Sequence, residues 1–142
     1  MSTHNTTDLR TIAFTGQGGA GKTSLIETLL HRTGMISTPG SIEKGTTVCD
    51  YDPLEKTHLH SLKLAVTHLT HQDTLIHLLD TPGLPDFMGP ALCALDAVET
   101  VAVVINAQNG IEFTTSRMME WAAARKLCRM IVINKIDAEN LD

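Results

Sequence analysis

Residues 16–23 read Gly-Gln-Gly-Gly-Ala-Gly-Lys-Thr and match the pattern G-x-x-x-x-G-K-[ST] at every fixed position. Glycines have no Cβ, so their backbone N–H groups can curl around phosphate oxygens. The unpaired N–H groups and the dipole of a following helix also favour an anion. Lys22 can reach the β- and γ-phosphates of a nucleotide, and the Thr23 hydroxyl can ligate Mg²⁺. The pattern therefore predicts a phosphate-binding loop.

The segments that flank this loop support the prediction. Residues 10–15 form a short, mostly apolar run that indicates a strand, and residues 22–33 indicate a helix. Gly34 is expected to cap that helix, because glycine adopts the left-handed conformation easily. A glycine-rich turn that binds nothing is the alternative, but a strand, a glycine-rich loop and a helix in this order are typical of a P-loop.

A second motif, Asp80-Thr81-Pro82-Gly83, directly follows a strand predicted at residues 74–79. A carboxylate at Asp80 can hold a water ligand of Mg²⁺, and the N–H of Gly83 can meet a γ-phosphate. The same residue types are also common in ordinary turns, and this alternative stays open for the motif by itself.

A third motif, Asn134-Lys135-Ile136-Asp137, follows an apolar strand predicted at residues 130–133. The carboxylate of Asp137 can accept hydrogen bonds from both N1–H and N2–H of guanine, whereas adenine lacks this pair of donors. Adenine would therefore leave the acid unpaired, which is costly in a buried site. The stem of Lys135 can lie along the base. A polar exit from the strand is the alternative interpretation.

Further strands and helices alternate along the chain. Strands are predicted at residues 62–69 and 101–105, a hairpin turn at 71–73, and helices within 86–98 and from 114 to 127. Thr114, Thr115 and Ser116 are the expected caps of the last helix. This alternation predicts an α/β fold with a three-layer, doubly wound, mostly parallel sheet and helices on both faces. In such a sheet ligands bind at the carboxyl ends of the strands, where all three motifs lie.

The composition limits the class of protein. The chain has 142 residues, which is the size of one domain. Its formal net charge of −5 argues against this segment as the part of a protein that binds nucleic acid electrostatically. Three cysteines without C-x-x-C spacing indicate free thiols in a reducing compartment. No apolar run approaches the roughly 18 residues of a membrane span. We therefore expect a cytoplasmic protein that makes no membrane contact.

Together the motifs resemble those of a known family. From about Thr11 to Asn140 the chain is similar to the GTP-binding domain of translational GTPases, and most of all to elongation factor G and its elongation-factor-G-like paralogues. The resemblance rests on the three motifs, on Asn109-Gly110-Ile111 and on residues 45–53, which read Gly-Thr-Thr-Val-Cys-Asp-Tyr-Asp-Pro. Residues 45–53 are the most family-specific part, since the other motifs occur in many GTPases.

The resemblance implies a P-loop NTPase fold, GTP and GDP as ligands, Mg²⁺ as cofactor, and the ribosome as a partner of a longer parent protein. It divides the chain into a disordered tail at 1–9 and a partial GTP-binding domain at 10–142, with switch I at 35–61 and switch II at 80–98. We expect switch I to be disordered until nucleotide binds. Because the family's last strand is absent, residues 130–133 should form an exposed apolar edge on which two copies could pair as a homodimer.

Two positions depart from the family's pattern. The family has Arg-Gly-Ile-Thr-Ile in switch I, whose Thr ligates Mg²⁺, and here Ser61 keeps a hydroxyl at that position. The family's His after Asp-Thr-Pro-Gly orients the attacking water, and here the position is Leu84. Leucine neither donates nor accepts a hydrogen bond, so GTP hydrolysis is expected to be slow. The alternatives are a nucleotide-dependent binding module with negligible hydrolysis, or a P-loop protein that uses ATP.

The predicted site combines the three motifs with Ser61. The catalytic candidates are Lys22, Asp80 and Gly83, and the candidate Mg²⁺ ligands are Thr23 and Ser61. The candidate nucleotide-binding residues are Gly16, Gln17, Gly18, Gly19, Ala20, Gly21, Lys22, Thr23, Ser24, Asp80, Gly83, Asn134, Lys135 and Asp137.

Overall fold

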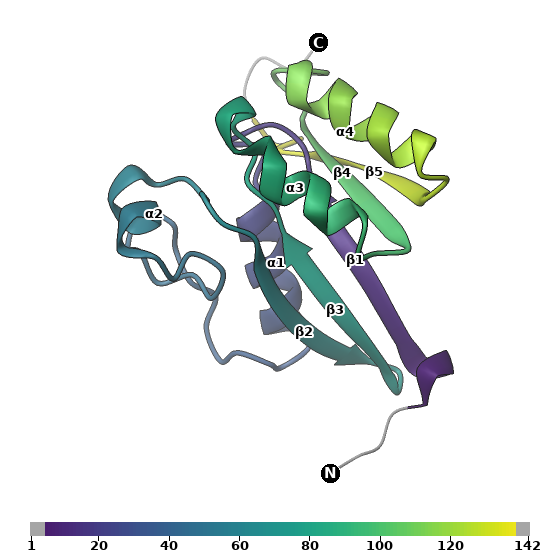
Figure 1. Cartoon of the computed structure of the whole chain (residues 1–142). Coiled ribbons are helices and arrows are strands. Elements are labelled where there is room, and N and C mark those ends of the chain that lie inside the picture. Colours follow the sequence, from purple (N-terminus) through teal and green to yellow (C-terminus); the bar gives the residue numbers. More distant parts are fainter. Residues whose placement is uncertain (1–4, 139–142) are drawn as a thin grey trace.

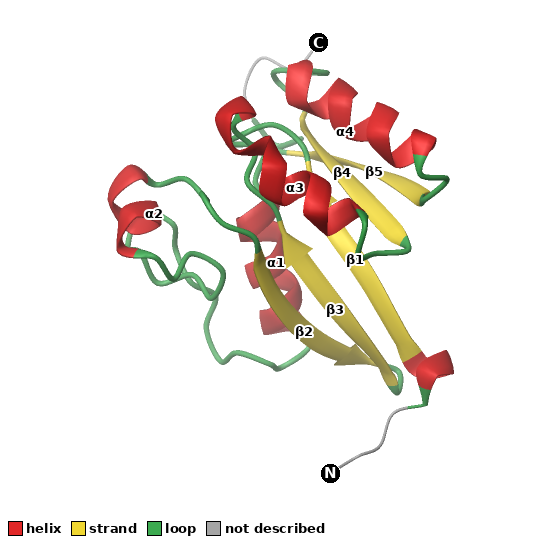
Figure 2. Ribbon diagram, viewed as in Figure 1, coloured by secondary structure: helices red, strands yellow, loops and turns green. Residues whose placement is uncertain are grey.

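The structure is a computed structural model that describes residues 5–138. Its strands are β1 (Leu9–Thr15), β2 (Ala65–His71), β3 (Thr74–Asp80), β4 (Thr100–Asn106) and β5 (Cys128–Asn134). Its helices are α1 (Lys22–Arg32), α2 (Pro53–His58), α3 (Met88–Leu95) and α4 (Phe113–Ala124), with short 3₁₀ turns at Thr6–Asp8 and Pro85–Phe87. Figures 1 and 2 show how these elements follow one another.

The five strands form one sheet in the order β2-β3-β1-β4-β5. β1 lies parallel to both β3 and β4, and β4 lies parallel to β5, so the predicted mostly parallel sheet is confirmed. Only β2 runs antiparallel to its neighbour, β3. A two-residue turn at Gln72 and Asp73 joins this pair, and both residues have positive φ, as the tight hairpin turns require.

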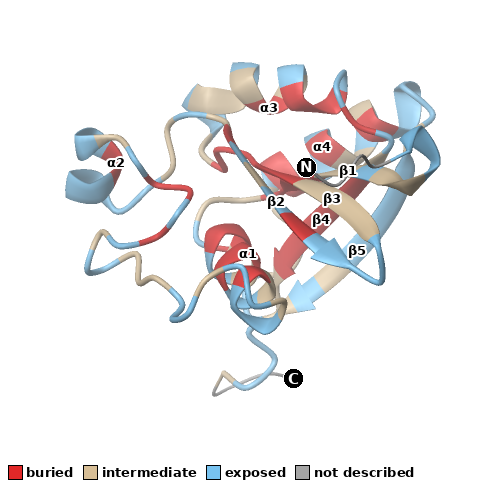
Figure 3. Ribbon diagram, turned by 90° about the horizontal axis from the view of Figure 1, so that it is seen from below, coloured by how far each residue is buried: buried red, intermediate tan, exposed pale blue. Residues whose placement is uncertain are grey.

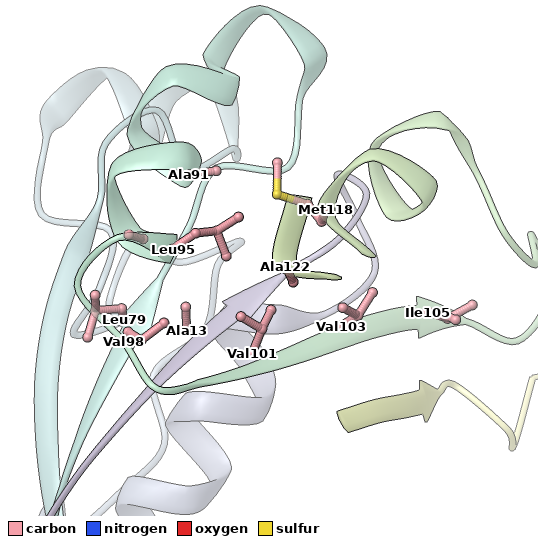
Figure 4. Packing of buried hydrophobic residues seen from close by; sticks show 11 residues of the cluster. Ala13, Leu79, Ala91, Leu95, Val98, Val101, Val103, Ile105, Met118 and Ala122 are labelled. Atoms are coloured by element: carbon pink, nitrogen blue, oxygen red, sulfur yellow. The ribbon is translucent and has the colours of Figure 1, made fainter. Parts of the chain in front are cut away.

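Helices cover both faces of the sheet, as predicted (Figure 1). On one face, α3 and α4 pack on β1 and β4, where Met118 and Ala122 of α4 point toward Val101 and Val103 of β4 (Figure 4). On the other face, α1 buries Ile26 and Leu30 in a second apolar cluster. The central strands are consequently buried, whereas much of β5 is exposed (Figure 3). The carboxyl ends of β1, β3 and β5 are thereby held on a rigid frame.

The end of α1 follows the prediction closely. The helix stops at Arg32, and Gly34 adopts φ +75° just beyond it. The N–H of Gly34 donates to the oxygen of His31, and the N–H of Met35 donates to the oxygen of Leu30. This pair of bonds is the Schellman arrangement that glycine favours.

Three local predictions need correction. Residues 35–61 are not structureless, because Pro53–His58 form α2. Thr114 and Thr115 lie inside α4 rather than at its cap, and Glu112 is the N-cap residue without a side-chain hydrogen bond. The predicted tail at 1–9 is too long, since Thr6–Asp8 form a 3₁₀ turn and β1 begins at Leu9. Residues 1–4 lie outside the described part of the chain.

The expected start of β2 is also wrong, by three residues. The N–H groups of Leu62 and Lys63 both donate to the carboxylate of Glu55, at 2.9 and 3.0 Å. Those donors are used outside the sheet, so β2 begins only at Ala65.

The outer position of β5 agrees with the prediction of an apolar edge. Within the described residues, β5 pairs only with β4, and Met130, Ile131 and Ile133 are 45%, 57% and 62% exposed.

The helices also show whether the described part of the chain could cross a lipid bilayer. Among the helices in residues 5–138, none combines the length and the apolarity needed to cross a membrane.

Candidate functional site

A cleft of about 280 Å³ opens beside the loop that joins β1 to α1. The predicted site residues that line it are Gly18, Gly19, Gly21, Lys22, Thr23, Ser24, Ser61, Gly83 and Lys135. Ile42, Glu43, Asp50, Leu59, His60 and Leu84 complete the lining. The glycine-rich loop, both switch segments and the residue after β5 therefore meet in one place, although they are far apart in the sequence.

Lys22 is buried at the start of α1 and folds back over its own loop. Its ammonium donates to the backbone oxygens of Gly16 and Gln17, each at 3.0 Å. Burial lowers the pKa of Lys22 to about 8, and the nearby charge of Asp80 opposes that shift. A cation that is poorly hydrated and held by carbonyls alone is well suited to meet a phosphate.

Gly83 of switch II packs tightly against that ammonium. A Cβ on Gly83 would collide with Nζ of Lys22 and with the backbone of residues 17–18, so only glycine fits here. The N–H of Gly18 donates to the oxygen of Gly83 at 3.0 Å. The phosphate-binding loop and the start of switch II are therefore joined directly.

Thr23 and Asp80 are buried polar residues at the bottom of the site, and we call this pair the polar floor. The Thr23 hydroxyl donates to Oδ2 of Asp80 at 2.6 Å, while Oδ1 of Asp80 is buried without a hydrogen-bond partner. Burial is the main reason that the pKa of Asp80 rises to about 6, although the Thr23 bond and Lys22 act in the opposite direction. An unpartnered buried carboxylate oxygen is costly in itself.

Ser61 of switch I joins this floor. Its Oγ lies 3.3 Å from Oγ1 of Thr23 and donates to Oδ1 of Asp50 at 2.8 Å. Two hydroxyls and the unpartnered oxygen of Asp80 are the kind of hard oxygen donors that Mg²⁺ takes, together with water and phosphate oxygens. The residues present thus fit the metal that the family resemblance implies.

At the other end of the cleft, the third motif is tied to the first. Nδ2 of Asn134 donates to the backbone oxygen of Ala20 at 2.9 Å, and a Cβ on Gly21 would collide with that same amide. Lys135 lines the cleft with a left-handed φ of 59°. Asp137 follows in an exposed turn and does not itself line the cleft.

Several predicted residues support the site from beneath rather than lining it. Gly16, Gln17, Ala20, Asp80 and Asn134 are absent from the lining of the cleft. Ala20 and Asp80 are each 1% exposed, and Gly16 packs so closely on Val104 that a Cβ would strike its backbone oxygen. These residues hold the loop in shape, and the hydrogen bond from Thr23 connects Asp80 to the lining of the cleft.

Three buried carboxylates that shape switch I were not predicted from the sequence. Asp50 accepts from the Thr47 and Ser61 hydroxyls. Glu27 of α1 accepts from the N–H groups of Gly40 and Val48.

Glu55 is the third carboxylate, and it accepts from the backbone of residues 52, 62 and 63. Two signals could have revealed this set. Glu27 is a charge on the apolar stripe of α1, and Asp52-Pro53-Leu54-Glu55 is a capping-box sequence.

The same group of acids surrounds the one buried cysteine among the described residues. Burial, followed by the charges of Asp80, Glu27, Asp50 and Glu55, raises the pKa of the Cys49 thiol. A thiol with a raised pKa is inert as a nucleophile, so Cys49 is a packing residue of the apolar cluster under switch I.

Comparisons with known proteins agree with this geometry. The family profile described as "Elongation factor Tu GTP binding domain" matches residues 7–142. An elongation factor G-like protein of Mycobacterium tuberculosis is 37% identical over 129 residues, which cover 91% of this chain and 18% of that protein. The tetracycline resistance protein TetO of Streptococcus mutans is 35% identical over 123 residues, which cover 87% of this chain and 19% of that protein.

A solved structure gives the same result. A crystal structure of a protein from Thermus thermophilus superposes with a TM-score of 0.88 at 38% identity, covering 90% of this chain and 19% of that one. The chain thus spans about a fifth of the length of the relatives it matches. From the P-loop, the shared cleft and these comparisons, we conclude that the chain belongs to the elongation factor Tu GTP binding domain family of translational GTPases.

Proposed function

We propose that this chain binds GTP and GDP together with Mg²⁺ and hydrolyses GTP slowly, as the switch of a ribosome-linked, elongation-factor-G-like protein. The observation that carries the proposal is the single cleft in which the P-loop, both switches and Lys135 meet. A nucleotide of this kind needs cationic and N–H contacts at its phosphates and selective acceptors at its base. The cleft offers the first set at Lys22, and the motif after β5 offers the second.

Each element has a distinct task under this proposal. Lys22 would exchange its two carbonyl contacts for phosphate oxygens, and Gly83 would present its N–H to the γ-phosphate. Thr23 and Ser61 would hold Mg²⁺, and Asp80 would bind one of its waters through the unpartnered Oδ1. The bound metal would neutralise charge on the phosphates.

Selectivity for guanine would come from the turn after β5. Asn134 holds that turn against the P-loop, and the exposed carboxylate of Asp137 is free to accept from the base. Because Asp137 does not line the cleft, its turn would fold toward a bound base. Nucleotide binding would also be expected to tighten switch I.

Calorimetric titration tests the binding part of the proposal. GDP and a non-hydrolysable GTP analogue, each with Mg²⁺, are expected to bind with one-to-one stoichiometry, and ATP should not compete. Removal of Mg²⁺ should weaken binding. Binding of ATP with equal affinity, or no binding of either guanine nucleotide, would reject the assignment.

A second candidate is a nucleotide-dependent binding module with negligible hydrolysis. The observation that favours it is Leu84, whose side chain lies against Gly18 within the cleft. Single-turnover hydrolysis, with and without ribosomes, separates the two functions. Homodimerisation through β5 has no support from the comparisons, and we do not propose it.

A further inference from the structure

Leu84 gives the cleft an apolar side chain at the position that directly follows Gly83. This residue lies next to Gly83, and its Cδ2 would be 3.1 Å from a Cβ placed on Gly18. A hydrocarbon side chain at that place can neither donate nor accept a hydrogen bond, so it cannot orient an attacking water. If the chain hydrolyses GTP, the acceptor for that water must come from another element.

His60 of switch I lines the same cleft as Leu84, and it is the only histidine among the described residues that does so. Its neighbour Ser61 places Oγ 3.3 Å from Oγ1 of Thr23, at the metal-binding end of the site. His60 therefore stands beside the end of the cleft where the γ-phosphate and Mg²⁺ are expected, rather than beside the base.

The backbone around His60 is firmly held. Leu59 ends α2 in a left-handed conformation with φ 56°, which turns the chain toward the cleft. The N–H of His60 then donates to the backbone oxygen of Glu55 at 3.3 Å. The carboxylate of Glu55, itself buried, accepts from Leu62 and Lys63 just beyond. His60 thus sits on a short segment that α2 clamps at both ends.

The other acceptors in the cleft are less suited to the task. Both carboxylate oxygens of Asp50 are already engaged, one with Thr47 and the other with Ser61. Glu43 is an exposed carboxylate, and its negative charge would repel a triphosphate. The imidazole of His60 carries no negative charge, and a ring nitrogen can accept a hydrogen bond from water.

We propose that His60 orients the attacking water, in place of the residue at position 84, and this inference rests on the proposed GTP-hydrolysing function. The water oxygen bonds to the γ-phosphorus while the bond from phosphorus to the β–γ bridging oxygen breaks, and that electron pair stays on GDP. A ring nitrogen of His60 accepts a hydrogen bond from the water. The water proton leaves to the released phosphate or to solvent, so GDP and inorganic phosphate are the only products.

Single-turnover hydrolysis of GTP by the 142-residue chain, measured as released phosphate at one fixed pH, tests this role. His60→Ala is expected to lower the rate on the order of 10²-fold, while GDP affinity, measured by calorimetry, stays unchanged. His60→Gln should keep part of the rate, because its amide oxygen can still accept a hydrogen bond from water. His58→Ala is the matched control, since His58 ends α2 and does not line the cleft.

The diagnostic result is a lower rate of hydrolysis in His60→Ala at unchanged GDP affinity, with part of the rate kept in His60→Gln. Adding Leu84→His to His60→Ala should restore part of the rate, because the imidazole then returns from switch II.

Three outcomes would overturn the inference while leaving nucleotide binding intact. His60→Ala could hydrolyse GTP at the unchanged rate. Glu43→Gln, rather than His60→Ala, could abolish hydrolysis. The unaltered chain could bind GTP and release no phosphate above the buffer control. A chain that binds no guanine nucleotide at all would instead reject the proposed function itself.

Discussion

Lys22 holds a charge where little water can reach it. Its ammonium rests on two backbone oxygens, and burial brings its pKa down to about 8. A bound polyphosphate favours the protonated lysine, so the pKa should rise when nucleotide binds. Above pH 8 the protein must therefore take up a proton on binding, which makes binding weaker.

We predict that GDP affinity falls by roughly a factor of ten between pH 7.5 and 9, beyond any change that is also seen in Lys22→Met. The Lys22→Met variant should bind more weakly at every pH, and this part of the pH dependence should vanish. Calorimetry at matched ionic strength measures both effects. Lys44→Met, an exposed lysine outside the cleft, should retain the pH dependence. Parallel pH curves for Lys22→Met and the unaltered chain would refute the assignment.

Asp80 is an acid whose charged form is disfavoured by burial, so its pKa shifts upward whereas that of Lys22 shifts downward. Its folded pKa is raised to about 6 from an unfolded value of 3.8, so the folded state resists ionisation. The resulting cost is absent well below pH 4, develops as pH rises toward 6, and is complete above it. One carboxylate oxygen without a partner fits a residue kept for metal binding rather than for stability.

Asp80→Asn should therefore gain stability relative to the unaltered chain as pH rises. The difference in free energy of unfolding should shift by about 2 kcal/mol between pH 4.5 and 7 in favour of the variant. Urea unfolding at several pH values measures it, and Mg²⁺ should no longer strengthen GDP binding to the variant. Asp73→Asn, at an exposed hairpin turn, should show no such shift. A pH-independent difference for Asp80→Asn would contradict the argument.

At the scale of elements, switch I is organised by short-range chemistry that the hydrophobic pattern does not reveal. α2 is six residues long and starts with Asp52, Pro53 and Glu55, which form a capping box with proline at the first helical position. A helix this short has no apolar period to detect. The capping residues were the available signal, and Asp52 and Pro53 lie at the end of the stretch most specific to the family.

We predict that Glu55→Ala destabilises the chain by about 2–4 kcal/mol, because three backbone N–H groups lose their acceptor. Urea unfolding measures the loss, and hydrogen exchange at the amides of Leu62 and Lys63 should become faster. Glu43→Ala, in the same segment but exposed, should change stability by less than about 0.5 kcal/mol. Unchanged exchange at residues 62 and 63 in Glu55→Ala would show that the clamp is not needed.

Across the whole molecule, the site depends on the order of the strands. β1 lies between β3 and β4, and β5 lies outside β4 (Figure 2). The parallel strands β1, β3 and β5 therefore end along one edge of the sheet, and the three motifs follow them there. The bond from Asn134 to Ala20 joins residues 114 positions apart and spans the distance from the outer strand to the P-loop. This bond connects the expected base-binding end of the cleft with the phosphate-binding end.

Asn134→Ala is therefore expected to weaken GDP binding by about tenfold, the equivalent of one lost hydrogen bond. Calorimetry measures the affinity, and thermal unfolding shows whether the fold is kept. Asn109→Ala, in an exposed turn after β4, is the control and should bind GDP normally. GDP affinity equal to that of the unaltered chain in Asn134→Ala would mean that the link has no role in binding.

Much of this protein is determined by residues that are close together in the sequence. The glycines and Lys22 of the P-loop, the capping of α1 at Gly34 and the apolar run of β4 each depend on neighbours within a few positions. Such local patterns specify backbone conformation directly, so the fold class and the three motifs followed from the sequence. The reason is that helix caps, glycine turns and strand burial are short-range effects.

Only the tertiary structure decided how distant polar groups meet. Glu27 of α1 binds the N–H groups of Gly40 and Val48, which come close only when switch I folds over α1, and no spacing in the sequence specifies those partners. The same closure brought His60 and Leu84 into one cleft and left Asp137 outside it. Long-range hydrogen bonds form only after the sheet and helices have set the distances, because their geometry is demanding.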